Sequence, residues 1–212
     1  MHRTQTAESQ ADMTPAQALE RLRLGNERFV SKTQVVRDLS QQIQQTSTGQ
    51  YPFATVLGCI DSRVPIEVVF DQGIGDVFAA RVAGNVVSDH MLGSFEFACK
   101  LAGSKLIVVL GHTSCGAVKG ACDGVEMEHL SELLRKVRHA VDDVPEPVEP
   151  DQRTSANATF VDAVARRNVE LAVKDIRTES TTLAELEQAG AIAVVGALYD
   201  VASGVVHFLD AD

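Results

Sequence analysis

The sequence predicts an α/β fold with a mainly parallel sheet of about five strands, flanked by helices. Short apolar runs of strand length alternate with segments of helical periodicity from residue 53 onward. These runs are continuously apolar, which is typical of parallel strands that are buried on both faces. The turn signal Ser203-Gly204 then returns the last run as an antiparallel strand at one edge of the sheet.

The chain alternates predicted strands and predicted helices. The strands are the runs 53–58, 76–82, 105–111, 191–199 and 205–209. Helices are expected over residues 65–70, 88–102, 123–140, 154–178 and 182–189. The Pro-rich, acidic stretch 142–152 is interpreted as a connector between two helices. We therefore expect a single domain over residues 13–212.

The N-terminal part of the chain predicts a helical arm over residues 13–48. Thr14 and Pro15 have the form of an N-cap followed by proline at the first helical position, which starts a helix that runs to Val30. A second, glutamine-rich helix is expected over 38–48. Residues 1–12 are polar and lack the features of a secretory signal. They are interpreted as a disordered or docking tail of a cytoplasmic protein.

Composition and charge exclude several classes of function. A formal net charge of −10 leaves no basic excess for binding nucleic acid or an anionic membrane surface. No apolar run approaches the roughly 18 residues that a membrane span requires. Four cysteines without a secretory signal do not indicate a disulfide framework, so reduced thiols are available as metal ligands.

Two clusters of reactive side chains follow predicted strands. Cys59, Asp61 and Arg63 come directly after the first strand, and His112 and Cys115 come after the run 105–111. Ligands of open α/β sheets bind at the carboxyl ends of the strands, so both clusters converge if the two strands are neighbours. Two thiolates and one imidazole form a three-ligand zinc set, and a catalytic zinc keeps its fourth position for water or substrate.

Structural interpretations compete with this metal site. Either motif alone is a weak signal, because cysteine is often simply buried. Cys99 and Cys122 have no partner at metal-ligand spacing and are expected to be structural. His90, His129, His139 and His207 are expected at the surface or at an interface, and the sequence does not indicate whether one of them relays protons.

The two motifs carry a resemblance to a known family. CIDSR at 59–63 and HTSCG at 112–116 resemble the paired motifs of β-class carbonic anhydrases, and the similarity runs from about Leu19 to the C-terminus. It includes the segments DQGIGDVFAARVAGN and GALYDVASGVVHFL. The resemblance implies one zinc ion per subunit, held by Cys59, His112 and Cys115, and reversible hydration of carbon dioxide to bicarbonate.

The resemblance also assigns catalytic roles. Zinc would acidify its bound water to a hydroxide that attacks carbon dioxide. Asp61 would accept a hydrogen bond from this nucleophile, and Arg63 would keep Asp61 ionised and away from the metal. In some family members the equivalent Asp becomes a fourth zinc ligand at low pH. The resemblance allows the same switch for Asp61, and the sequence leaves open whether the resting site is open or closed.

The substrate pocket is also assigned by resemblance. Gln50 matches a glutamine that donates to a substrate oxygen across a dimer interface, and Phe78 and Ala83 match the apolar wall of the pocket. Phe97 stands where plant-type members carry Tyr, and Gly116 is assigned to the same pocket. Gln50, Phe78 and Phe97 would come from a partner subunit, so a homodimer or homotetramer is expected.

Some family members bind inhibitory bicarbonate in a separate pocket formed by Trp, Arg and Tyr. Arg81 and Tyr199 match two of these positions, but Val56 replaces the Trp, so this inhibition is not expected. Two other functions remain open. One is a hydrolase of carbonyl sulfide or carbon disulfide on the same scaffold, and the other is a non-catalytic zinc protein that acts as a redox sensor or scaffold.

Overall fold

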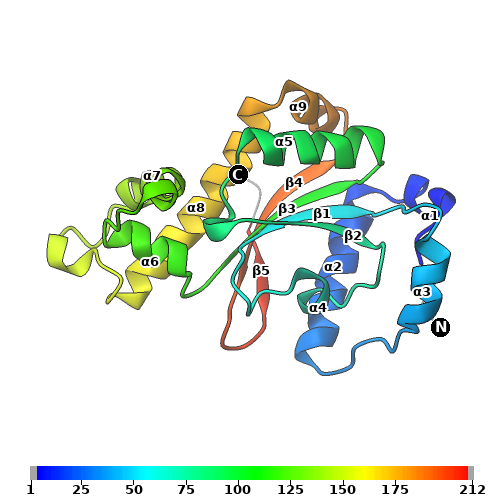
Figure 1. The fold of residues 1–212 in the computed structure, drawn as a ribbon, viewed down its shortest axis with the longest axis horizontal. Coiled ribbons are helices and arrows are strands. Elements are labelled where there is room, and N and C mark those ends of the chain that lie inside the picture. Colours follow the sequence, from blue (N-terminus) through cyan, green and yellow to red (C-terminus); the bar gives the residue numbers. More distant parts are fainter. Residues whose placement is uncertain (1–3, 210–212) are drawn as a thin grey trace.

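The computed structural model describes residues 4–209, and its centre is a five-stranded sheet (Figure 1). The strand order is β2-β1-β3-β4-β5. The strands are β1 (Ala54–Gly58), β2 (Val77–Arg81), β3 (Leu106–His112), β4 (Ala193–Tyr199) and β5 (Val206–Phe208). All neighbours pair parallel except β4 and β5, which pair antiparallel. The predicted fold class, including the antiparallel edge strand, is confirmed.

Helices cover both faces of this sheet, as the continuously apolar strands require. Along β3, Leu106, Val108 and Leu110 face one core cluster, whereas Ile107 and Val109 face another. The first cluster is closed by α2 (Pro15–Val30) and α4 (Ile66–Val69), which lie below the sheet in Figure 1. The second is closed by α5 (Asp89–Glu96), α8 (Ala158–Glu179) and α9 (Thr181–Gln188).

A third apolar cluster lies beyond the carboxyl ends of the strands. It joins α6 (Gly116–Cys122) and α7 (Glu128–Asp143) to the first half of α8, and it contains Cys59 and Cys115. The metal-ligand candidates therefore have an apolar support behind them.

One helix prediction was wrong in its bounds. The expected helix 123–140 is α7, which begins at Glu128, and α6 before it was missed. Gly116 and Gly120 weaken the helical pattern of α6, and Gly124, at φ 65°, lies in the turn between the two helices. The expected helix 88–102 is α5 continued by a π-helical turn, η2 (Phe97–Leu101). Two short 3-10 turns are also present, η1 (Ala83–Asn85) and η3 (Pro150–Gln152).

The N-terminal segment packs on its own chain. Helix α1 (Ala7–Ala11) starts with a capping box between Thr6 and Ser9, and buried Gln10 donates hydrogen bonds to the carbonyls of Pro52 and Ala102. The interpretation of residues 1–12 as a disordered or docking tail stays a prediction, and residues 1–3 lie outside the described residues.

The predicted arm is an integral layer of the fold. Helix α2 buries Ala18 and Leu22 completely in the chain's own core, and α3 (Leu39–Thr46) follows it with Asp38 as its N-cap. Within residues 4–209, no helix combines the length and the apolar character that crossing a membrane would demand.

Candidate metal centre

The candidate ligands lie where two neighbouring parallel strands end. Cys59 directly follows β1, and His112 is the last residue of β3. The two strands pair with Gly58 opposite Leu110, so their carboxyl ends lie side by side. Cys115 is the N-cap of α6, three residues after His112. The predicted convergence of the two motifs is therefore present in the structure.

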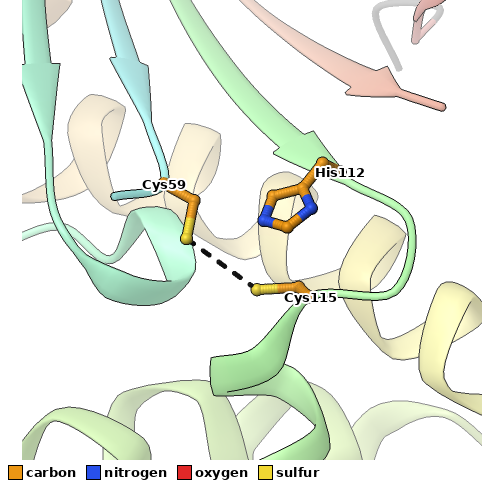
Figure 2. A group of neighbouring side chains, drawn as sticks. All are labelled: Cys59, His112 and Cys115. Atoms are coloured by element: carbon orange, nitrogen blue, oxygen red, sulfur yellow. Dashed lines mark hydrogen bonds between the residues drawn. The ribbon is translucent and has the colours of Figure 1, made fainter. Parts of the chain in front are cut away.

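The three side chains point toward one another in a buried site (Figure 2). The exposed fractions of Cys59, His112 and Cys115 are 4%, 0% and 1%. Their ligand atoms lie within 4.8 Å of one another, and the two Sγ atoms are 4.0 Å apart. Two thiolates bound at about 2.3 Å in a tetrahedral zinc site lie about 3.8 Å apart. The donor set and its spacing therefore fit a zinc ion.

The protonation of His112 also fits a metal. Its Nδ1 lies 3.0 Å from the carbonyl oxygen of Thr113. A carbonyl only accepts hydrogen bonds, so Nδ1 carries the proton and Nε2 presents its lone pair. Nε2 is buried and has no hydrogen-bond partner among the described residues. A histidine with a purely structural role normally has hydrogen-bond partners for both ring nitrogens. A buried acceptor nitrogen without a partner, facing two thiols, therefore indicates a metal ligand.

The two thiols influence each other strongly. The hydrogen bond between them lowers the pKa of Cys59 and raises that of Cys115, and burial raises the pKa of Cys115 further. Two buried sulfurs at this distance share a proton, because two adjacent negative charges repel each other. A divalent cation between them favours the loss of both protons.

Asp61 and Arg63 form an ion pair beside these ligands. Arg63 donates from Nε to Oδ1 of Asp61 at 2.9 Å and from Nη2 to Oδ2 at 2.7 Å. The side-chain hydrogen bonds from Arg63 hold the pKa of Asp61 well below its usual range. Oδ2 of Asp61 lies 4.0 Å from Nε2 of His112, so an ionised carboxylate borders the metal position.

Two further side chains and one backbone amide hold the loop of the first motif. Arg81, at the end of β2, donates to the carbonyls of Cys59 and Asp61 at 2.8 and 2.6 Å. The amide of Gly84 donates to Sγ of Cys59 at 3.4 Å, and Asn168 on α8 donates to the Gly84 carbonyl at 2.8 Å. These contacts fix the position of the Cys59 sulfur.

Sequence reasoning did not identify these supporting contacts. Arg81 was noted only for its match to an inhibitory pocket. Asn168 could have been identified from the sequence, because it lies on the apolar face of its helix, beside Val164 and Val169, and this face is buried. A buried side-chain amide needs a hydrogen-bond partner, which indicates a specific contact at this position.

The remaining predicted site residues fall into two groups. Ala83 is half-buried in η1, next to Gly84, and Gly116 is exposed directly after Cys115 and faces open space. Both lie beside the metal ligands in the same chain.

Gln50, Phe78 and Phe97 are not brought to this site within one chain. Gln50 is exposed and precedes β1, whereas Cys59 follows β1, and five strand residues span about 17 Å. The rings of Phe78 and Phe97 are 6.2 Å apart and line a groove of about 780 Å³ between edge strand β2 and helix α5. Phe97 is 53% exposed.

The other cysteines and histidines lie where structural roles were expected. Cys99 lies in η2 and is buried in the core cluster that α5, α8 and α9 close. Cys122 packs half-buried against the cluster of α6 and α7. His90, His129, His139 and His207 are exposed. Within the described part of the chain, the one group of three possible metal-ligating side chains is Cys59, His112 and Cys115.

Fold and site together define an α/β protein with a buried three-ligand metal centre at the carboxyl ends of its strands. The family model for carbonic anhydrases matches residues 54–206. Carbonic anhydrase 2 of Mycobacterium tuberculosis is 37% identical over 193 residues, 90% of each chain. A carbonic anhydrase of Mycolicibacterium smegmatis is 38% identical over 199 residues, covering 91% of this chain and 92% of that protein.

A solved structure of a β-carbonic anhydrase from Aspergillus fumigatus superposes with a TM-score of 0.70 at 27% identity and covers 87% of each chain. This chain belongs to the β-carbonic anhydrase family and is an enzyme of the lyase class. The resemblance predicted from the two motifs is confirmed.

Proposed function

We propose that this protein is a zinc enzyme that reversibly hydrates carbon dioxide to bicarbonate and a proton, with one zinc ion per subunit. The observation that carries the proposal is the convergence of Sγ of Cys59, Nε2 of His112 and Sγ of Cys115 on one point beside an ionised Asp61. These three side chains would hold a zinc ion and leave one coordination position for water or substrate. When bound, zinc supplies Lewis acidity that lowers the pKa of a coordinated water toward neutrality.

The residues of this chain then hold and orient the reactants. The carboxylate of Asp61 accepts a hydrogen bond from the attacking water, which directs an oxygen lone pair toward the carbon of carbon dioxide. Arg63 holds that carboxylate through two hydrogen bonds and keeps it ionised. A swing of Asp61 onto the metal, in which the hydrogen bonds from the Arg63 side chain would be lost, stays a prediction.

The apolar wall of the pocket suits a small neutral substrate. Ala83 contributes to it from the same chain, and we assign Gln50, Phe78 and Phe97 to the site of a second copy. Their distance from the metal ligands within one chain supports this assignment. The exposed edge strand β2 and the groove beside it offer the surface for pairing.

A homodimer is the smallest unit that completes this pocket. Two β-carbonic anhydrases of Sordaria macrospora are described as tetrameric, and one of their structures is 25% identical to this chain and covers 81% of it, with a TM-score of 0.67. A homotetramer built from such dimers is therefore the larger assembly that we propose.

Stopped-flow hydration of carbon dioxide, on protein whose zinc content has been measured, tests the proposal. We expect activity in proportion to bound zinc, loss on removal of the metal by a chelator and return on addition of zinc. Zinc-loaded protein that hydrates carbon dioxide no faster than buffer would overturn it.

The same preparations separate the alternatives. Release of sulfide from carbonyl sulfide or carbon disulfide, without carbon dioxide hydration, would indicate the related hydrolase. A non-catalytic zinc protein has no need of the Asp61–Arg63 pair beside the metal, so this pair favours the enzyme. The cytoplasmic location expected from the N-terminal sequence stays a prediction.

A further inference from the structure

The short loop between two of the metal ligands contains a strained residue. His112 ends β3 and Cys115 caps α6, so residues 113 and 114 must reverse the chain for both side chains to face one point. Ser114 achieves this in the left-handed region, with φ at 54°. This conformation is uncommon for residues with a side chain and costs roughly 1 kcal/mol.

A carboxylate from a helix that is distant in sequence holds this residue. The amide of Ser114 donates to Oδ1 of Asp162 at 2.9 Å. Asp162 lies near the start of α8, and its neighbours Val161 and Val164 are fully buried against α6 and α7. Its backbone is therefore part of a rigid, well-packed element. The Ser114 carbonyl is only weakly held on its other side, by Arg63 at 3.4 Å.

We propose that Asp162 is a positioning residue that fixes the Ser114 peptide and thereby the separation of His112 and Cys115. Asp162 is outside the ligand group of Cys59, His112 and Cys115, and it acts through the amide of Ser114. Hydrogen bonds that orient metal ligands from outside the coordination shell typically change metal affinity by about 10–100-fold. The inference rests on the proposed zinc site, because only there does the separation of these two ligands matter.

Four variants of the full-length protein test this role: Asp162→Ala, Asp162→Asn, Ser114→Gly/Asp162→Ala and, as a matched control, Asp175→Ala. Asp175 is another half-buried aspartate of α8, outside the ligand loops. Affinity for Zn²⁺ and Co²⁺ is measured by competition with a chelator, well below the unfolding temperature of each variant. The absorption spectrum of the Co²⁺ form reports the geometry of the ligands independently of activity.

We expect Asp162→Ala to weaken metal affinity by about 10–100-fold and to change the Co²⁺ spectrum. Asp162→Asn should stay within about 3-fold of wild type, because its amide oxygen still accepts the hydrogen bond. Ser114→Gly should restore most of the affinity lost in Asp162→Ala, since glycine adopts a positive φ without a steric penalty. A purely structural role of Asp162 would lower the unfolding temperature and would not be rescued by a glycine in the loop.

Two outcomes overturn the inference. One is an Asp162→Ala protein whose affinity and Co²⁺ spectrum match those of Asp175→Ala, and the other is a double variant that shows no recovery. If either occurs while the wild type binds zinc and hydrates carbon dioxide, only the role of Asp162 fails. A wild type that binds no zinc would overturn the proposed function as well.

Discussion

Two clusters of buried polar side chains lie in different surroundings. In the first, which we call the Asp71 cluster, the carboxylate of Asp71 in the loop between α4 and β2 is paired with Arg28 and Arg37, and Arg37 also holds the Asp71 carbonyl. At the carboxyl ends of the strands, two sulfurs and an acceptor nitrogen face one another. The buried charges of the Asp71 cluster are paired within the chain, so removing one partner should destabilise the fold. The two sulfurs and the nitrogen are all electron-pair donors, and their convergence fits a bound cation.

The largest effect is expected from breaking the metal-ligand cluster of Cys59, His112 and Cys115. Cys115→Ser should lose most of its zinc and lower the rate of carbon dioxide hydration by roughly 10³-fold or more, because a hydroxyl is a poor replacement for a thiolate. Zinc analysis and stopped-flow hydration measure both. Cys122→Ser, at a half-buried cysteine outside the cluster, is the matched control and should keep both zinc and activity. Stoichiometric zinc in Cys115→Ser would contradict its assignment as a ligand.

Breaking the Asp71 cluster should lower the stability of the fold and leave the zinc site and its activity unchanged. Asp71→Asn leaves Arg37 buried without its counter-charge, so we expect the free energy of unfolding to fall by about 3 kcal/mol. Zinc content and hydration rate of the folded variant should stay unchanged. Urea unfolding followed by circular dichroism measures the first. Asp142→Asn removes the same charge from an exposed position and should have little effect.

The stability provided by Asp71 should also depend on pH. Burial opposes its ionisation, but hydrogen bonds from Arg37 and Arg28 outweigh burial and lower its pKa in the folded protein. A lowered pKa gives stability that is fully present above the unfolded value of about 3.9 and is lost as the pH falls through the folded value. The difference in unfolding free energy between wild type and Asp71→Asn should therefore shrink below about pH 4. A difference that grows on acidification would contradict this pairing.

The sequence predicted the metal-ligand cluster better than the Asp71 cluster, for a physical reason. Cys59, His112 and Cys115 have chemistry that a sequence displays directly, and each follows an apolar run whose end defines its place. Arg28, Arg37 and Asp71 are ordinary charged residues, and only folding shows that they meet. The strands were predictable because uninterrupted apolar runs leave few alternatives, whereas glycines hid helix α6.

Contacts between distant elements account for most of what the sequence did not predict. Asp162 and Ser114 are 48 positions apart, and Asn168 and Gly84 are 84 positions apart. Neither pair has a local pattern that links its members. Residues assigned to a partner's pocket are a different case, since one chain alone does not bring Gln50 to a metal site.

A third change sharpens the distinction between binding the metal and using it. Asp61→Asn should keep its zinc but lower kcat/KM for hydration by roughly 10²-fold, because the amide loses the negative charge and the pairing with Arg63. Cys115→Ser should lose zinc and activity together, so the two variants separate the functions. An Asp61→Asn protein with full zinc and the wild-type rate would remove Asp61 from the mechanism.

The smallest effect is expected of Gln50, which lies far from the metal ligands of its own chain. Gln50→Ala should lower kcat/KM by about 10-fold, the effect of one lost hydrogen bond to substrate, with zinc content unchanged.

If Gln50 serves the neighbouring subunit, a mixed dimer of Gln50→Ala and Cys115→Ser chains has one complete site, with zinc ligands from the first and Gln50 from the second. Co-expression of the two chains, each with its own affinity tag, should give mixed dimers whose rate per zinc exceeds that of the Gln50→Ala homodimer. An unchanged rate per zinc would mean that Gln50 does not act across an interface, and the pocket would then have to be completed within one chain.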